Sequence, residues 1–243
     1  MYFKTLRHAT WAAVVLFAAA CSLSLPWSDE PIGQEVNVAF VLKNNLLFLP
    51  SMTVDHRPGR FLFGSADARS MLDPKFAVSA STHSLQLNER ESLRLTPEIV
   101  DLHGVSDGII GADVWDGRAI TIDYHAGLLT YQKQGIFPAD MILYNYADAP
   151  MINVIIDGHK TGAIVDTASP DTLVLPRGNA PAGRRNARVQ IADTDFGNVD
   201  VKLADVSAAH IGNRLLSRFL VSIDYGRRQV GLWRDPRTAL KAE

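Results

Sequence analysis

The chain has 243 residues, of which 47% are hydrophobic and 21% are charged, a composition that is typical of folded globular proteins and excludes a largely disordered chain. It carries 24 basic and 26 acidic residues, a formal net charge of −2, and therefore lacks the basic surplus that nucleic-acid binding requires. We expect no nucleic-acid partner, and the length allows one large or two small domains.

The chain begins with a segment typical of exported proteins. Lys4 and Arg7 precede a largely apolar run at residues 9–20, which is shorter than the roughly 20 residues of a membrane-spanning helix. We therefore predict a signal peptide over residues 1–20. Ordinary secretion after an Ala-x-Ala cleavage site would leave the following residue, Cys21, without a special role.

The residues around Cys21 favour a second kind of signal. Residues 18–20 are alanines, and together with Cys21 they are similar to a bacterial lipobox, in which cleavage exposes a cysteine for lipidation. Cys21 is the only cysteine, so it forms no intramolecular disulfide in an exported protein. We predict a lipoprotein signal peptide at 1–20, lipidation of Cys21, and attachment to a membrane of the bacterial cell envelope, facing the periplasm.

The rest of the first half reads as a tether followed by short strands. Residues 21–35 mix proline, serine and acidic residues without a period, as a tether does. Short β-rich runs separated by turn residues then predict an all-β fold. The predicted strands are at 36–43, 46–54, 60–63, 85–87, 93–95, 119–124 and 128–131. Predicted helices are limited to one turn at 68–72 and short helices at 112–115 and 213–217.

The second half continues the same β pattern. Two apolar runs, 151–156 and 161–165, flank Asp157-Gly158, which predicts a β-hairpin. Further strands are predicted at 172–176, 189–191, 199–203 and 219–224. A turn is predicted at 193–197, between the runs 189–191 and 199–203.

A repeated pattern relates the two halves. The sequence FLFGSA at 61–66 corresponds to AIVDTA at 163–168, and ITIDY at 120–124 corresponds to VSIDY at 221–225. The offset between matched residues is nearly constant. Asp166 follows Gly64 by 102 residues, Gly212 follows Gly111 by 101, and Asp224 follows Asp123 by 101. We infer two copies of a unit of about 100 residues. The predicted organisation is a degenerate first lobe (36–132), a connector (133–148), a second lobe (149–235) and a tail (236–243).

The second copy resembles the retropepsin and pepsin-like aspartic peptidases. The resemblance rests on an apolar strand that ends in Asp166-Thr167-Ala168-Ser169, on the apolar run 172–176, and on an Ile-Gly pair at 211–212. It departs from the family at Ala168, where glycine is usual. The resemblance implies an all-β, two-lobed pepsin/retropepsin-like (acid protease) fold with few short helices.

The resemblance also implies a function and a set of site residues. Asp166 and Thr167 would be catalytic, and the partner would be a peptide or protein bound between the lobes, with no cofactor and no metal. The residues that would line the substrate site are Gly64, Ser65, Ala168 and Ser169. The seven histidines show no i, i+4 pair, which also disfavours a helical metal site.

The first copy has Gly64 where the second copy has Asp166. Peptide hydrolysis in this family uses two carboxylates about 3 Å apart that share one proton. Asp67 is a candidate second carboxylate, although a solvated turn residue is the other interpretation of Asp67. Alternatively, two chains pair their copies of Asp166. If the dyad alone is missing, Gly64→Asp is expected to restore it.

Two functions therefore remain open from the sequence. One is an envelope lipoprotein of the aspartic-peptidase family, an aspartic-type endopeptidase that hydrolyses extended peptides through Asp166 if a second carboxylate is available. The alternative is a pseudo-peptidase, a lipoprotein for peptide binding or assembly without catalysis. Two other carboxylates, Asp123 and Asp224, are predicted to cap turns. Trp115 and Trp233 are predicted to be core or lobe-closing aromatic residues.

Overall fold

The computed structural model describes residues 35–115, 117–132, 135 and 137–237. All of them belong to the compact unit Ile32–Glu243. The predicted signal peptide, Cys21 and nearly all of the predicted tether lie outside the described residues, as do residues 238–243. Within the described part of the chain, no helix is long and apolar enough to span a membrane.

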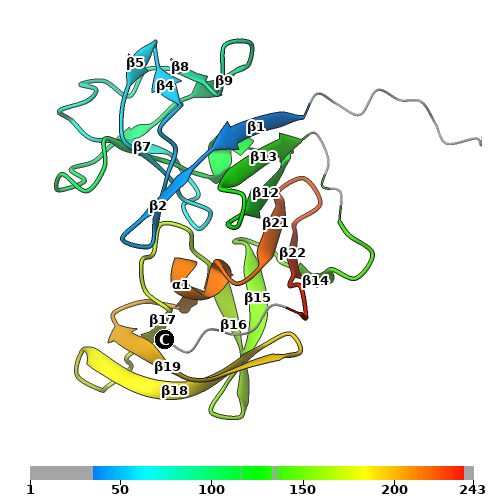
Figure 1. Ribbon diagram of the computed structural model, residues 1–243. Coiled ribbons are helices and arrows are strands. Elements are labelled where there is room, and N and C mark those ends of the chain that lie inside the picture. Colours follow the sequence, from blue (N-terminus) through cyan, green and yellow to red (C-terminus); the bar gives the residue numbers. More distant parts are fainter. Residues whose placement is uncertain (1–34, 116, 133–134, 136, 238–243) are drawn as a thin grey trace, which may run out of the picture. The chain divides into compact units, whose positions relative to one another are not determined.

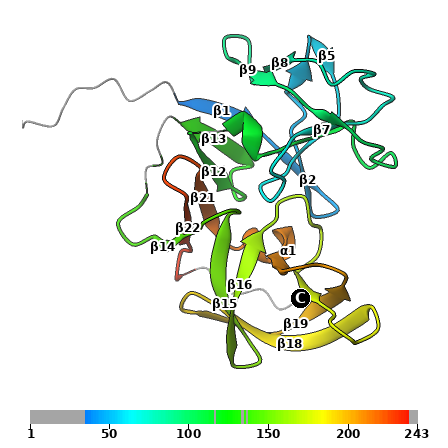
Figure 2. The ribbon, with the colours of Figure 1, turned by 180° about the vertical axis from the view of Figure 1, so that it is seen from behind.

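A central antiparallel sheet contains strands from both copies. β12 and β21 lie side by side (Figures 1 and 2), although about a hundred residues separate them. In their register Ile120 pairs with Ile223. The strand order is β1 (Val36–Ala39), β13 (Leu128–Gln132), β12 (Ala119–Asp123), β21 (Leu220–Asp224), β22 (Gln229–Trp233) and β14 (Ile142–Asn145). The closing hairpins of the two copies therefore form one structure.

The first copy adds two further sheets with shorter strands. The six-stranded one has the order β10 (Glu98–Ile99), β7 (Met71–Leu72), β11 (Gly108–Ile110), β6 (Phe61–Phe63), β3 (Leu46–Phe48) and β2 (Val41–Lys43). The four-stranded one has the order β5 (Arg57–Pro58), β4 (Thr53–Val54), β8 (His83–Gln86) and β9 (Ser92–Leu95). A 3-10 helix, η1 (Ala112–Trp115), follows β11.

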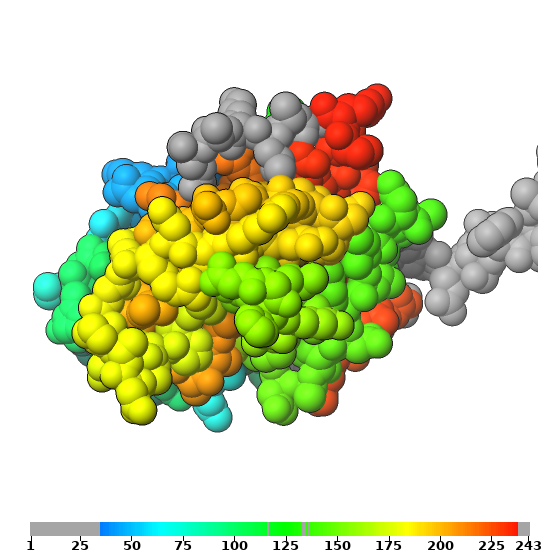
Figure 3. Space-filling model, turned by 90° about the horizontal axis from the view of Figure 1, so that it is seen from below, coloured from blue at the N-terminus to red at the C-terminus, as the bar shows by residue number. Residues whose placement is uncertain are grey.

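The second copy closes its strands into a barrel. The barrel order is β15 (Met151–Ile156), β16 (His159–Val165), β20 (Ala209–Ile211), β17 (Leu173–Pro176), β19 (Thr194–Ala204) and β18 (Gly183–Ile191). Asp157 and Gly158 both have positive φ, 50° and 84°, as a two-residue hairpin turn requires. The long β18–β19 hairpin, yellow to gold in Figure 3, covers much of the face seen there. A four-residue helix, α1 (Asn213–Leu216), follows β20.

One hydrophobic core extends through both copies. Its buried side chains include Phe63 and Trp115 from the first copy and Val165 and Leu216 from the second. Burial of apolar surface is the main stabilising contribution to folding, so the two copies depend on each other for stability. The core position predicted for Trp115 is confirmed, because this side chain is fully buried.

Two local predictions were wrong. Residues 68–72 do not form a helical turn, because Met71 and Leu72 pair with β10 and β11 instead; here pairing with more distant segments overrides the local preference. The turn predicted at 193–197 is shorter, because Ala192 adopts a φ of 55° and β19 already begins at Thr194. Within the predicted connector, β14 pairs with β22 at the edge of the central sheet.

The shared sheet yields a prediction about cooperativity. Ile120→Ala and Ile223→Ala are each expected to lower the free energy of unfolding by roughly 2–5 kcal/mol, because both side chains are fully buried where the copies meet. Urea unfolding followed by circular dichroism and tryptophan fluorescence measures this. Ile142→Ala is the control, since Ile142 is 37% exposed on β14. Separate unfolding of the two copies would contradict a shared core.

Candidate active site

Two loops of the same geometry follow equivalent strands of the two copies. β6 runs parallel to β11, and β16 runs parallel to β20. At the strand ends, the amide of Gly64 donates to the carbonyl of Ile110, and the amide of Asp166 donates to the carbonyl of Ile211, each at 3.0 Å. Gly64 and Asp166 therefore hold corresponding positions in space as well as in sequence.

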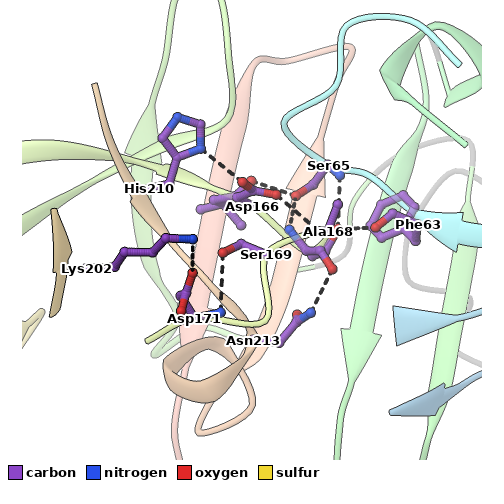
Figure 4. Close-up of polar contacts among 11 residues, drawn as sticks. Phe63, Ser65, Asp166, Ala168, Ser169, Asp171, Lys202, His210 and Asn213 are labelled. Atoms are coloured by element: carbon purple, nitrogen blue, oxygen red, sulfur yellow. Dashed lines mark hydrogen bonds and ion pairs between the residues drawn. The ribbon is translucent and has the colours of Figure 1, made fainter. Parts of the chain in front are cut away.

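The two loops are joined by four reciprocal hydrogen bonds. Thr167 Oγ1 accepts from the Ser65 amide at 2.9 Å and donates to the Phe63 carbonyl at 2.6 Å. Ser65 Oγ accepts from the Thr167 amide at 3.1 Å and donates to the Val165 carbonyl at 2.6 Å. Figure 4 shows Ser65 beside Phe63 at this contact. The first copy thus occupies the face that a symmetric pairing of two Asp166 loops would need.

This contact involves two of the predicted site residues. Both Ser65 and Thr167 are fully buried, and their hydroxyls are engaged in the loop contact. The contact therefore fixes Thr167, the residue that follows Asp166, and its catalytic role remains a prediction. The prediction that Ser65 lines the substrate site requires an accessible hydroxyl, whereas the structure uses this hydroxyl to hold the loops together. Ala168 and Ser169 remain predictions as substrate-site residues.

The Asp166 carboxylate is held from two sides. Its Oδ1 accepts a hydrogen bond from the Ala168 amide at 3.1 Å, and its Oδ2 lies 3.0 Å from Nδ1 of His210 (Figure 4). The side chains of Asp166 and His210 are 18% and 22% exposed, so both reach solvent. His210 was not among the site residues expected from the sequence, because no local pattern marks it. The parallel pairing of β16 with β20, in which Ile164 pairs with His210, brings it to Asp166.

The Asp67 carboxylate occupies the space beside Gly64. A Cβ atom added to Gly64 would collide with Oδ2 of Asp67 and lie 2.6 Å from Cγ2 of Ile109. Burial, together with repulsion from Asp166 and against an opposing effect of His210, raises the pKa of Asp67 to about 6. The raised pKa and partial burial of Asp67 disfavour its interpretation as a solvated turn residue.

The same contacts revise the expected effect of Gly64→Asp. An aspartate at position 64 would enter space that Asp67 and Ile109 already fill. The Asp67 side chain would have to move out, so the substitution exchanges one carboxylate for another. Restoration of the symmetric arrangement requires removal of the Asp67 carboxylate as well.

Further polar groups fix the loop that carries Asp166. Asn213 is fully buried, and its Nδ2 donates to the carbonyls of Thr167 and Asn45 at 2.6 and 2.7 Å. Its Oδ1 accepts from the hydroxyl of Tyr124 at 2.7 Å. Asn213 therefore ties the second-copy loop to two segments of the first copy.

A charged cluster supports the loop after Ser169. Asp171 contacts Arg184 Nη2 at 2.5 Å and Lys202 Nζ at 3.2 Å, and Figure 4 shows the Lys202 contact. Burial acts to raise the pKa of Asp171, but the hydrogen bonds from Arg184 and Lys202 outweigh it and hold that pKa below its usual value. This carboxyl is therefore an ionised structural group.

The remaining candidates are structural. Asp123 Oδ1 accepts from the amides of His125 and Ala126, and Asp224 Oδ1 accepts from the amide of Arg227, which confirms that both carboxylates cap turns. Trp233 is partly buried, and its indole donates to Asp140 at 2.6 Å. No group of three or more potential metal ligands occurs among the described residues.

Comparison with known proteins identifies the fold. The structure is similar to the crystal structure of the aspartic proteinase from Irpex lacteus, with a TM-score of 0.58 and 10% sequence identity, covering 84% of this chain and 98% of that chain. The predicted all-β, two-lobed pepsin-like fold is therefore confirmed. The sequence matches no protein-family model and no curated protein, so the likeness concerns the fold alone.

The loop contact generates a stability prediction. Thr167→Val keeps the shape of the side chain but leaves the buried Ser65 amide without its acceptor, so the free energy of unfolding should fall by about 1–3 kcal/mol. Chemical denaturation measures the change. Thr161→Val is the matched control, because Thr161 is exposed on the same strand, β16. Equal stability of Thr167→Val and wild type would contradict the importance of the contact.

Proposed function

We propose that this chain is an aspartic-type endopeptidase in which Asp67 replaces the carboxylate that position 64 lacks. The observation that carries the proposal is the placement of the Asp67 carboxylate against Gly64, beside a loop that is hydrogen-bonded to the Asp166 loop. The substrate is an extended peptide or protein segment bound between the lobes. The pepsin-like fold supports this proposal, and the two partly exposed carboxyl groups supply the chemistry.

The two carboxyl groups take different roles in the proposed reaction. Asp166 accepts a proton from a water molecule, whose oxygen attacks the peptide carbonyl carbon, while protonated Asp67 gives its proton to the carbonyl oxygen. When the tetrahedral adduct breaks its C–N bond, the proton on Asp166 moves to the leaving nitrogen, and a hydroxyl of the adduct returns a proton to Asp67. The cycle leaves both groups in their starting states.

The pKa of Asp67 sets the upper end of the pH range in which the protein should be active. Because this pKa is raised to about 6, Asp67 holds its proton below that pH and loses it above. Activity that needs the protonated form should therefore fall as the pH rises through about 6.

Substitution of the two carboxylates tests the proposal. Asp166→Asn and Asp67→Asn should each lower kcat for peptide cleavage by roughly a hundredfold or more, as measured by mass spectrometry on a defined peptide library with the purified full-length protein. Asp148→Asn is the control, since Asp148 is an exposed aspartate. Full activity of Asp67→Asn would contradict the role given to Asp67.

A paired substitution tests the exchange between positions 64 and 67. Gly64→Ala should displace the Asp67 carboxylate and reduce activity as Asp67→Asn does, because the added Cβ needs the same space. The double substitution Gly64→Asp with Asp67→Ser reproduces the Asp-x-x-Ser spacing of residues 166–169 and should recover activity that Asp67→Ser alone lacks. Wild-type activity in Gly64→Ala would exclude this packing argument.

A second candidate function is peptide binding without hydrolysis. The glycine at position 64 supports it, because the two copies lack a matching aspartate pair. The same peptide library distinguishes the candidates, since a binder should retain peptides in pull-down or fluorescence anisotropy measurements while cleaving none. In that case Asp166→Asn would change affinity alone.

The location of the protein is part of the same proposal. We place it at the bacterial cell envelope, held by a lipid on Cys21, because Cys21 follows three alanines after an apolar run and is the sole cysteine. Cys21→Ser should move the protein from the membrane fraction to the soluble fraction of the envelope, as measured by fractionation and immunoblotting. Ser22→Ala is the control. Unchanged membrane association of Cys21→Ser would exclude a lipid anchor at this residue.

A further inference from the structure

His210 contacts Asp166 in a way that has no counterpart in the first copy. Nδ1 of His210 lies 3.0 Å from Oδ2 of Asp166. In the proposed reaction Asp166 is ionised, and an ionised carboxylate can only accept hydrogen bonds, so the imidazole is the donor in that state. His210 lies in β20, between Ile164 of β16 and Val174 of β17, and this position in a sheet fixes the direction of its side chain.

The equivalent position of the first copy carries no polar group. Ile109 precedes His210 by 101 residues and is paired in the same way, with Leu62 of β6 and Met71 of β7. Its Cγ2 atom faces Gly64, as the imidazole of His210 faces Asp166. The two sides of the site therefore differ in hydrogen-bonding capacity as well as in the origin of their carboxylates.

The difference extends to the carboxyl groups themselves. The Asp166 carboxylate accepts from the Ala168 amide and from His210. Among the residues that the structure describes, no hydrogen bond to the Asp67 carboxylate is found. Hydrogen bonds to the charged form favour ionisation, while burial without them favours the protonated form. The local structure thus gives the two carboxyl groups different hydrogen-bonding surroundings.

Other charged groups near the site are already engaged. On β19 and β18, two other strands of the barrel, Lys202 and Arg184 both contact Asp171. Burial, with smaller contributions from Tyr146 and Asp67, raises the pKa of Tyr225. His210 is thus the ionisable donor that contacts Asp166 directly.

We propose that His210 is a positioning residue that assigns the two catalytic roles, holding Asp166 as the ionised base and leaving Asp67 as the proton donor. This inference rests on the proposed peptidase function for its effect on rate. The assignment of the proton, however, is a property of the resting protein. It can therefore be measured whether or not the protein cleaves peptides.

Two kinds of substitution at His210 separate the hydrogen bond from the charge. His210→Asn places an amide nitrogen close to the position of Nδ1, so it keeps a neutral donor to Asp166. His210→Ile copies the residue at position 109 of the first copy and removes the donor. His210→Ala removes the donor without adding a branched side chain, which keeps the test available if His210→Ile does not fold. His159→Asn, at an exposed position of β16, is the control.

Carbon-13 NMR of labelled aspartate carboxyl groups gives the readout that does not depend on activity. In wild type, the titration near pH 6 should appear at Asp67 alone, and in His210→Asn the titration should also stay at Asp67. In His210→Ile and His210→Ala, the titration should be shared between Asp67 and Asp166, because Asp166 then keeps only the hydrogen bond from the Ala168 amide. In all three variants the titration should also move to higher pH, since the His210 charge that lowers the pKa of Asp67 is lost. A titration shared by Asp67 and Asp166 in wild type would overturn the inference. So would a titration in His210→Ala that is the same as in wild type.

Kinetics with a cleaved peptide gives the second readout. His210→Ile and His210→Ala should lower kcat roughly tenfold to a hundredfold, the range set by a hydrogen bond to a charged group, with KM unchanged. The kcat of His210→Asn should stay within about threefold of the wild-type value, because the amide keeps a hydrogen bond to Asp166. If wild type cleaves nothing while NMR gives the expected titrations, the peptidase proposal fails and the assignment by His210 stands. Equal kcat in wild type and His210→Ala would overturn the positioning role.

Discussion

The candidate site depends on the hydrogen-bonded contact between the two loops at Ser65 and Thr167. Each hydroxyl donates to a carbonyl and accepts from an amide of the other copy, so four buried polar groups of the main chain are satisfied at once. A buried polar group without a partner is costly, which makes the relative position of the loops difficult to change. Asp166, next to Thr167, and the Gly64–Asp67 turn are consequently held against each other.

Within this fixed frame, the two copies have diverged at matched positions. The first copy has Gly64 and Ile109 where the second has Asp166 and His210, and its carboxylate comes from Asp67 through space that glycine leaves open. A third difference follows the same pattern. Tyr124 donates to Asn213, but the corresponding hydroxyl of Tyr225 is buried without a partner among the described residues, because residue 112 is alanine. The supporting network is therefore stronger around the loop of Asp166.

The divergence has a chemical consequence for the proposed reaction. Two identical carboxylates in identical surroundings would share a proton without preference. Here one carboxylate has two donors and the other has none among the described residues, while burial and the charge of Asp166 raise the pKa of Asp67 to about 6. The asymmetry thus favours a fixed direction of proton transfer in weakly acidic solution.

The sequence alone determined the all-β fold, the two copies and the loop of Asp166, because each depends on a local pattern: short β-rich runs between turn residues, a repeated spacing, and an aspartate after an apolar strand. It also showed that position 64 lacks a carboxylate. Tertiary structure decided the direction of the Asp67 side chain. It also decided the contact between His210 and Asp166, which are 44 residues apart in the sequence. Side-chain direction after a turn, and the parallel pairing of β16 with β20, depend on contacts between distant segments, which a local pattern does not encode.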